Sequence, residues 1–159
     1  MAAVRNVNHI VLYVRDLERS VEFYEALFGF RVVARAGRTM AFLRAAGSSN
    51  HHDLGLAAVG AQAPSAPQGS VGLYHTAWQV DRIEDVADAY RELIARGALT
   101  GASDHGATKS VYGLDPDGNE FEIMWMLPRE HWGEHEEAAP TRPLDLAAEL
   151  RRWGAGAAT

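Results

Sequence analysis

The chain has 159 residues, a hydrophobic fraction of 47%, a charged fraction of 23% and a formal net charge of −6. These values are ordinary for one globular domain with a buried core, and the acidic balance provides no basic surface for nucleic acid. The chain contains no cysteine, which excludes disulfides, thiolate chemistry and cysteine-based metal sites. No apolar run is long enough to span a membrane, and residues 1–6 lack the apolar core of a signal peptide, so we expect a cytoplasmic protein.

The first half of the chain predicts a strand, a helix and three further strands, followed by a loop rich in Ala, Gly, Pro and Ser. Asp16 is a helix N-cap residue, Gly29 follows the last residue of the helical pattern, and Gly37 marks a turn between two strands. In chain order, the expected elements are a strand at 7–14, a helix from near Leu17, strands at 30–35, 39–45 and 51–59, and a loop at 60–70.

The second half repeats this scheme and ends in a polar tail. Asp81 and Glu84 have the spacing of a capping box, Gly97 ends the helix, and residues 115–119 place Pro and Gly as a tight turn requires. The expected elements are a strand at 73–80, a helix from 83 to about 96, strands at 110–114 and 120–126, and a tail helix at 144–153 with Leu146, Leu150 and Trp153 on one stripe. We expect the tail helix to pack on the domain or on a dimer partner; the alternative is a lid over a pocket.

Five residues recur at the same interval of 66 positions, which indicates that one structural unit has been duplicated. The recurring pairs are His9 and His75, Val14 and Val80, Glu18 and Glu84, Tyr24 and Tyr90, and Leu27 and Leu93. We therefore expect an α+β fold in which two tandem βαβββ units form a cup-like mixed sheet with helices outside, plus the tail helix. The expected domain covers residues 1–128, with repeats at about 4–59 and 71–127, and the tail covers 129–159.

Strand alternation places three candidate metal ligands on one side of this sheet. Side chains alternate along a strand, so His9 lies opposite the all-aliphatic face of its strand. In the same way, His75 lies opposite the face with Trp78, and Glu122 lies opposite an apolar face. Because the apolar faces belong against helices, all three side chains are expected to face the cup. Two imidazoles and one carboxylate form the facial triad that suits non-haem Fe(II), and Mn(II) and Zn(II) accept the same ligand types. The alternative is two core histidines and a solvated carboxylate.

Several motifs are similar to those of the vicinal oxygen chelate superfamily, in which paired βαβββ units surround a metal. The similarity covers roughly residues 4–127. It rests on Asn-His-Ile at 8–10, the run from Asp16 to Tyr24, His-Thr-Ala at 75–77, and Asp-Pro-Asp-Gly-Asn at 115–119 followed by Glu122. The resemblance implies the same metal ligands, His9, His75 and Glu122. These motifs identify the superfamily without choosing a reaction.

Three further residues resemble the active-site residues of ring-cleaving extradiol dioxygenases. By this resemblance His52, taken to lie mid-strand with His51 on the opposite face, is the acid–base histidine. Tyr112 corresponds to an active-site tyrosine that donates a hydrogen bond to the substrate, and His105 to a second active-site histidine. The stretch from His105 to Tyr112 is shorter than in two-domain catechol dioxygenases, so His105 either joins the site or caps a surface turn.

The resemblance therefore implies an Fe(II)-dependent extradiol dioxygenase, with Mn(II) as another metal, that cleaves a catechol-type aromatic ring with O2. Its partners would be a small aromatic diol, O2 and a second copy of the chain in a homodimer, with no nucleic acid and no membrane. One alternative is a glyoxalase I-like or epimerase-like isomerase, which needs a carboxylate from the first half; Asp53 is the candidate within residues 51–56. The other is a metal-free, ligand-sequestering resistance protein.

Overall fold

Each half of the chain forms the strand–helix–three-strand unit that the repeat predicts. The structure, a computed structural model, describes residues 1–67 and 69–156, and the boundary between the two units lies after Ser70. The predicted α+β class and the tandem βαβββ units are confirmed. The last three residues of the expected tail lie outside the described residues. In the part of the chain that is described, no helix combines the length and the apolarity of a membrane span.

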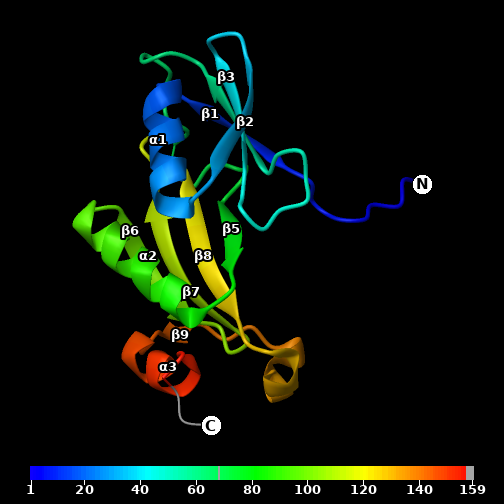
Figure 1. The fold of residues 1–159 in the computed structure, drawn as a ribbon, viewed down its shortest axis with the longest axis vertical. Coiled ribbons are helices and arrows are strands. Elements are labelled where there is room, and N and C mark those ends of the chain that lie inside the picture. Colours follow the sequence, from blue (N-terminus) through cyan, green and yellow to red (C-terminus); the bar gives the residue numbers. More distant parts are fainter. Residues whose placement is uncertain (68, 157–159) are drawn as a thin grey trace. The chain divides into compact units, whose positions relative to one another are not determined.

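The first unit is a four-stranded sheet with one helix. Its elements are β1 (Ile10–Val14), α1 (Leu17–Phe28), β2 (Arg31–Ala36), β3 (Met40–Arg44) and β4 (Leu54–Ala58). The sheet order is β1-β4-β3-β2, in which β1 and β4 are parallel and the other pairs are antiparallel. Helix α1 packs against β3 and β4, and Figure 1 shows it along one face of this sheet.

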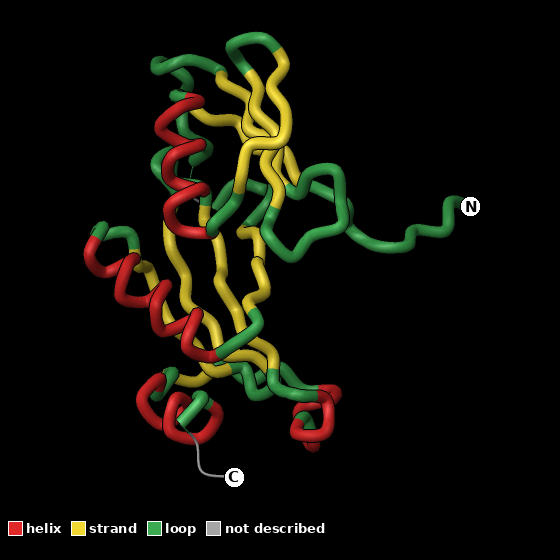
Figure 2. The backbone as a smooth tube through the Cα atoms, viewed as in Figure 1, coloured by secondary structure: helices red, strands yellow, loops and turns green. Residues whose placement is uncertain are grey.

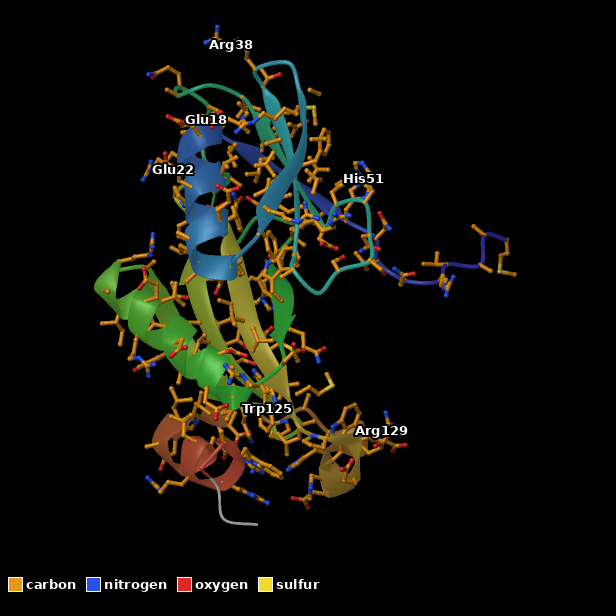
Figure 3. The ribbon with its side chains drawn as sticks, in the orientation of Figure 1. Glu18, Glu22, Arg38, His51, Trp125 and Arg129 are labelled. Atoms are coloured by element: carbon orange, nitrogen blue, oxygen red, sulfur yellow. The ribbon has the colours of Figure 1, made fainter. Side chains whose placement is uncertain are left out.

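Helix α1 begins and ends where the sequence predicts. The Asp16 side chain accepts a hydrogen bond from the backbone N–H of Arg19, and Gly29 adopts a left-handed conformation with a φ of 63°. Its apolar stripe is buried, whereas Glu18 and Glu22 are exposed on the other side of the helix (Figure 3). The core of this unit is made by Val14, Leu17, Val21, Tyr24, Ala41, Leu43, Leu54 and Leu56.

Two strands of the first unit are shorter than the sequence predicts. Strand β1 begins at Ile10 rather than at residue 7, and β4 begins at Leu54 rather than at residue 51. His9 and His52 therefore lie in the segments that lead into these strands. The cause at β4 is Asp53, whose side chain accepts hydrogen bonds from residues of the preceding loop and so favours a turn over an extended strand.

The second unit is a five-stranded sheet. Its elements are β5 (His75–Val80), α2 (Ile83–Ala95), β6 (Leu99–Asp104), β7 (Thr108–Leu114), β8 (Glu120–Met126), the short 3-10 helices η1 (Arg129–His131) and η2 (Gly133–Glu137), β9 (Arg142–Pro143) and α3 (Leu146–Trp153). The order is β5-β8-β7-β6-β9, with β5 and β8 parallel. Helix α2 packs against β7 and β8 (Figure 2).

The cap of α2 differs from the prediction. The N-cap residue is Arg82, and the carboxylate of Asp85 accepts a hydrogen bond from its backbone N–H at 3.2 Å. Glu84 instead accepts a hydrogen bond from the backbone of Ala155, beyond α3, so tertiary structure redirects its side chain. The turn at residues 115–119 is confirmed, because the Asp115 carboxylate accepts hydrogen bonds from the backbone of Asp117 and from Asn119.

Strand β6 was not predicted as a separate element. Its sequence from Leu99 to Asp104 consists mainly of small or polar residues and has no apolar alternation. It is a strand because β7 pairs with one of its edges and β9 with the other. Long-range hydrogen bonding thus overrides a weak local signal.

The tail after Met126 returns to the second unit. Residues Arg142–Pro143 add β9 to the edge of β6, and α3 packs against α2. The ring of Trp153 lies 5.8 Å from that of Trp125, which Figure 3 shows beside α3. Lys109, buried on β7, pairs with Asp104 and lies 3.9 Å from Glu149 of α3.

Candidate metal centre

A histidine–glutamate pair lies on neighbouring parallel strands of the second unit. His75 opens β5 and Glu122 is in β8, and Nε2 of His75 lies 3.2 Å from Oε2 of Glu122. Two ligands bound to one ion at about 2.1 Å and at right angles lie about 3 Å apart. Imidazole with carboxylate is also a donor set that Fe, Mn and Zn accept. The pair fits two adjacent positions of one metal ion.

Tyr112 extends this pair across the sheet. It is the direct β7 neighbour of Glu122 in β8, and its hydroxyl lies 3.3 Å from Glu122 Oε1. Burial, followed by the charge of the Glu122 carboxylate, raises the pKa of Tyr112 to about 12. The phenol therefore keeps its hydrogen at neutral pH and can act as a hydrogen-bond donor or acceptor.

His105 joins the same hydrogen-bonded chain. Its Nε2 lies 2.8 Å from the Tyr112 hydroxyl, and its Nδ1 lies 2.8 Å from the carbonyl oxygen of Pro140. The hairpin that carries His105 turns at Gly106, which has a φ of 78°. His105 thus contacts Tyr112 and lies next to the turn, and its role in the active site stays a prediction.

The first unit contains a separate cluster of histidines. The rings of His9 and His52 lie 4.3 Å apart, and Nδ1 of His51 lies 3.1 Å from Nδ1 of His52. His52 precedes β4, so the prediction that it lies mid-strand with His51 on the opposite face is wrong: the two rings meet on the same side of the turn. Burial, and then the nearby His9, lower the pKa of His52, so its ring is neutral at neutral pH and can accept a proton.

A pair of asparagines, Asn8 and Asn50, orients His9. Asn8 donates from Nδ2 to Oδ1 of Asn50 at 3.2 Å, so its own amide oxygen faces His9, 2.9 Å from Nδ1. The His9 Nδ1 consequently carries the hydrogen, and Nε2 keeps the lone pair that a metal ion requires. Asn8 is adjacent to His9 in the sequence, and this position pointed to a contact between them. Asn50 is 42 residues from Asn8, and no sequence pattern pointed to it.

Asp53 is fully engaged within the first unit. Its Oδ2 accepts a hydrogen bond from the Ala45 N–H at 2.9 Å, and its Oδ1 accepts from the Ser48 hydroxyl at 2.6 Å and from Asn50 Nδ2 at 2.8 Å. Burial opposes ionisation, but these hydrogen bonds outweigh it and hold the pKa of Asp53 below its usual value. The carboxylate is therefore committed to closing the loop before β4.

Replacing Asp53 with alanine is expected to lower the free energy of unfolding by about 2 kcal/mol at pH 7, because three hydrogen bonds to a charged group are lost. The folded-state pKa is depressed, so this stabilisation is complete above the ordinary aspartate pKa of about 3.9 and is lost as the pH falls below it. Urea unfolding from pH 7 to pH 3 should show a wild-type advantage that shrinks only in acid. The exposed Asp81→Asn change is the control, and an equal difference at pH 3 would contradict the assignment.

The internal symmetry identifies the first-unit counterpart of Glu122. In the second unit Ala77 of β5 is the register partner of Glu122, and in the first unit Val11 of β1 is the register partner of Gly55. Val11 and Ala77 are equivalent at the interval of 66, so Gly55 stands where Glu122 stands in the second unit. A Cβ at Gly55 would lie 3.1 Å from Cγ2 of Val11. The first unit therefore has no carboxylate at this position.

Among the residues that the structure describes, no three His, Asp or Glu side chains come together as a metal-binding group. His75, Glu122, Tyr112 and His105 form one chain of contacts in the second unit, and His9 lies beside His52 in the first unit. The three-ligand set of His9, His75 and Glu122 stays a prediction.

Comparison with known proteins identifies the family. The sequence profile of the Glyoxalase/Bleomycin resistance protein/Dioxygenase superfamily matches residues 6–123. The chain belongs to this superfamily. Its fold agrees with that of other members: a glyoxalase/dioxygenase from Nostoc punctiforme, 22% identical, superposes with a TM-score of 0.66 over 78% of this chain and 92% of that one. At this identity the likeness shows the fold alone.

Relatives of the chain in sequence include proteins named as dioxygenases. A catechol-2,3-dioxygenase of Bacillus subtilis (strain 168) is 33% identical over 94% of this chain and 52% of its own length. A manganese-dependent 2,3-dihydroxybiphenyl 1,2-dioxygenase of Geobacillus genomosp. 3 is 32% identical over 78% of this chain and 38% of its own length. The metallothiol transferase FosB of Lysinibacillus sphaericus (strain C3-41) is 28% identical over 76% of this chain and 82% of its own length. The chain thus spans about half the length, or less, of these two dioxygenases.

Proposed function

We propose that this superfamily member is an Fe(II)-dependent extradiol dioxygenase that cleaves a catechol-type aromatic ring with O2. The observation that carries the proposal is the asymmetry between the two units. Glu122 has no carboxylate counterpart, because Gly55 occupies the equivalent position. A metal ion held by only three protein ligands keeps positions for both oxygens of a diol and for O2. Dioxygenases at 31–33% identity among the relatives support the same reaction class.

The proposed ligands are His9, His75 and Glu122. The Asn8 amide leaves Nε2 of His9 available, and the separation between His75 and Glu122 suits adjacent ligands of one ion. When bound, the metal would supply the coordination of diol and O2 and the transfer of electrons between them. Fe(II) is the proposed ion, with Mn(II) as the other candidate, since one relative is manganese-dependent.

The remaining polar residues are assigned to substrate oxygens and protons. His52, a neutral imidazole beside His9, takes a proton from the diol and returns it to the product. Tyr112, beside Glu122, makes a hydrogen bond with a substrate oxygen bound to the same ion. His105 holds the Tyr112 hydroxyl in place from the other side.

The structure of the first unit disfavours an isomerase of the glyoxalase I type. Such an enzyme needs a further carboxylate from the first unit as ligand or base. Gly55 lacks a side chain, and both oxygens of Asp53 are occupied by loop hydrogen bonds. A metal-free sequestering protein would have no need for the His75–Glu122 pair.

An oxygen-electrode screen tests the proposed function. Protein loaded anaerobically with Fe(II) or Mn(II) is mixed with a panel that includes catechol, alkylcatechols and 2,3-dihydroxybiphenyl. The expected result is consumption of one O2 per diol, together with a conjugated ring-opened product, a semialdehyde from catechol and a keto acid where the cleaved carbon carries an alkyl or phenyl group. No oxygen uptake with any diol, combined with isomerisation of a hemithioacetal by Zn(II)- or Ni(II)-loaded protein, would overturn the proposal. A protein that neither binds metal nor gains activity with Fe(II) would favour sequestration.

A Tyr112→Phe change is expected to lower kcat about 100-fold without loss of metal, because it removes one hydrogen bond to an oxygen whose charge changes during the reaction. The measurement is steady-state oxygen uptake alongside metal analysis. Tyr74→Phe is the matched control. The ring centroid of Tyr74 lies 4.8 Å from that of His75, but Tyr74 is 76% exposed. Equal activity of the Tyr112 variant and wild type would remove Tyr112 from the proposed site.

The cytoplasmic location and the homodimer expected from the sequence remain part of this proposal. Size-exclusion chromatography with light scattering measures the oligomeric state directly.

A further inference from the structure

His105, which contacts Tyr112, forms a hydrogen bond with a segment that lies beyond the residues matched by the superfamily profile. That match ends at residue 123, whereas the segment in question is Pro140–Pro143, called the strap from here on. Its carbonyl at Pro140 lies 2.8 Å from Nδ1 of His105. We propose that the strap fixes His105 in the tautomer that carries its hydrogen on Nδ1, so that Nε2 accepts the hydroxyl hydrogen of Tyr112.

The hydrogen-bonding partners determine this tautomer. A main-chain carbonyl can only accept, so the 2.8 Å contact requires a hydrogen on Nδ1. A neutral imidazole has one N–H, so Nε2 has only a lone pair, and at 2.8 Å it accepts from the Tyr112 hydroxyl. The phenol has a single hydrogen, and the Glu122 carboxylate is the more distant of its two acceptors, at 3.3 Å. The shorter contact, with Nε2 of His105, takes the hydrogen.

This arrangement changes the role that the sequence resemblance implies for Tyr112. With its hydrogen directed at His105, the phenol oxygen presents lone pairs on its other side. It is then an acceptor for a substrate hydroxyl rather than a donor to a substrate oxygen. This consequence, unlike the tautomer itself, rests on the proposed function.

The strap is anchored at two points, both on the C-terminal side of the contact. Arg142 and Pro143 pair with Asp104 and Ser103 at the edge of β6, directly before His105. Beyond the strap, α3 packs against α2, and its Glu149 lies 3.9 Å from the buried Lys109 amine, which also pairs with Asp104.

The hairpin that carries His105 is also fixed from within. The Gly106 N–H donates to the Asp104 carboxylate at 2.7 Å, and the His105 N–H donates to the Thr108 carbonyl at 2.9 Å. The carbonyl of Pro140 and the imidazole therefore both belong to ordered structure. Pro140 is accordingly a positioning residue that acts through His105.

The tautomer can be read in the metal-free, full-length protein by NMR of ¹⁵N-labelled histidine. At pH 8, above the ordinary histidine pKa of about 6.5, His105 should show a protonated Nδ1 and an unprotonated Nε2. The His105→Gln variant assigns the signals by their disappearance. A hydrogen on Nε2 with a bare Nδ1 would overturn the proposal.

Two strap variants distinguish the Pro140 carbonyl from the neighbouring Thr141 hydroxyl as the group that sets the tautomer. Pro140→Gly frees the backbone and is expected to give a mixture of both tautomers. Thr141→Val removes a hydroxyl that lies 3.4 Å from Nδ1 and should leave the tautomer unchanged. If Pro140→Gly leaves the tautomer unchanged and Thr141→Val alters it, then the Thr141 hydroxyl sets the tautomer, which contradicts the proposal.

Activity supplies a second readout where the protein turns over a diol. Pro140→Gly is expected to lower kcat about 10-fold with unchanged metal content, as is usual when a partner that orients an active-site histidine is lost. The NMR experiment needs neither metal nor substrate, so failure to find ring cleavage would refute the proposed function and leave the tautomer result standing.

Discussion

Replacing Glu122 with alanine is expected to abolish stoichiometric metal binding and, with it, turnover. Glu122 would supply the only anionic ligand of the proposed set, and its loss leaves two neutral imidazoles to hold a divalent ion. Loss of a residue that merely orients a metal ligand typically lowers affinity 10- to 100-fold, so loss of this ligand should lower it by more than about 100-fold. Calorimetric titration with Fe(II) and Mn(II) under anaerobic conditions, with metal analysis of the purified protein, measures the change.

The chain provides a matched control on the same strand. Glu120, two residues earlier in β8, is the register partner of His75 in β5 and of Leu114 in β7, but no metal role is assigned to it. Glu120→Ala should keep metal affinity within a few-fold of wild type, and circular dichroism should show both variants folded. Stoichiometric iron in the Glu122→Ala protein would contradict the ligand assignment. His9→Ala tests the contribution of the first unit, and it too should lose the ion.

Replacing His52 with phenylalanine is expected to lower kcat by about 10²- to 10⁴-fold while the metal stays bound, which is the usual range for losing a general acid–base group. Phenylalanine keeps an aromatic ring against His9 and against Phe42, whose ring centroid lies 4.9 Å from that of His52. The change therefore removes the nitrogen atoms and keeps most of the packing. Oxygen uptake under saturating diol, with the iron content of the same sample, separates loss of catalysis from loss of metal.

His51 is the control for His52, because the two imidazoles are adjacent and in contact. The exposed ring of His51 is labelled in Figure 3, on the loop that precedes β4. His51→Phe should change kcat by only a few-fold. If His52→Phe retains full turnover, or if both variants lose the same amount, the proposed acid–base role of His52 is wrong.

The two predictions differ in what they test. The Glu122 experiment tests for a metal site and would hold equally for any metal-dependent member of the superfamily. The His52 experiment tests the reaction, since the ring-cleaving proposal assigns the proton acceptor of the first unit to a histidine, whereas the isomerase alternative requires a carboxylate there. A protein that passes the first test and fails the second would be a metal enzyme with a different chemistry.

Much of the fold was determined by local sequence. The interval of 66 residues between His9 and His75 identified the duplication, and Asp16 with Gly29 set the limits of α1. The alternation of polar and apolar residues in β8 placed Glu122 opposite Phe121 and Ile123, and the structure shows Glu122 beside His75, as that alternation requires. Periodicity and capping depend on residues a few positions apart, which is why sequence alone reveals them.

Other features depended on residues far apart in the chain. Strand β6 exists because β7 and β9 pair with its edges. Strand β4 begins at Leu54 instead of residue 51 because loop groups donate hydrogen bonds to the carboxylate of Asp53. The Pro140 carbonyl meets His105 across 35 residues. Hydrogen bonds over such separations leave no periodic trace in the sequence. The sequence by itself thus determined the repeat and the candidate ligands, whereas tertiary structure decided which polar atoms face one another and which way their hydrogens point.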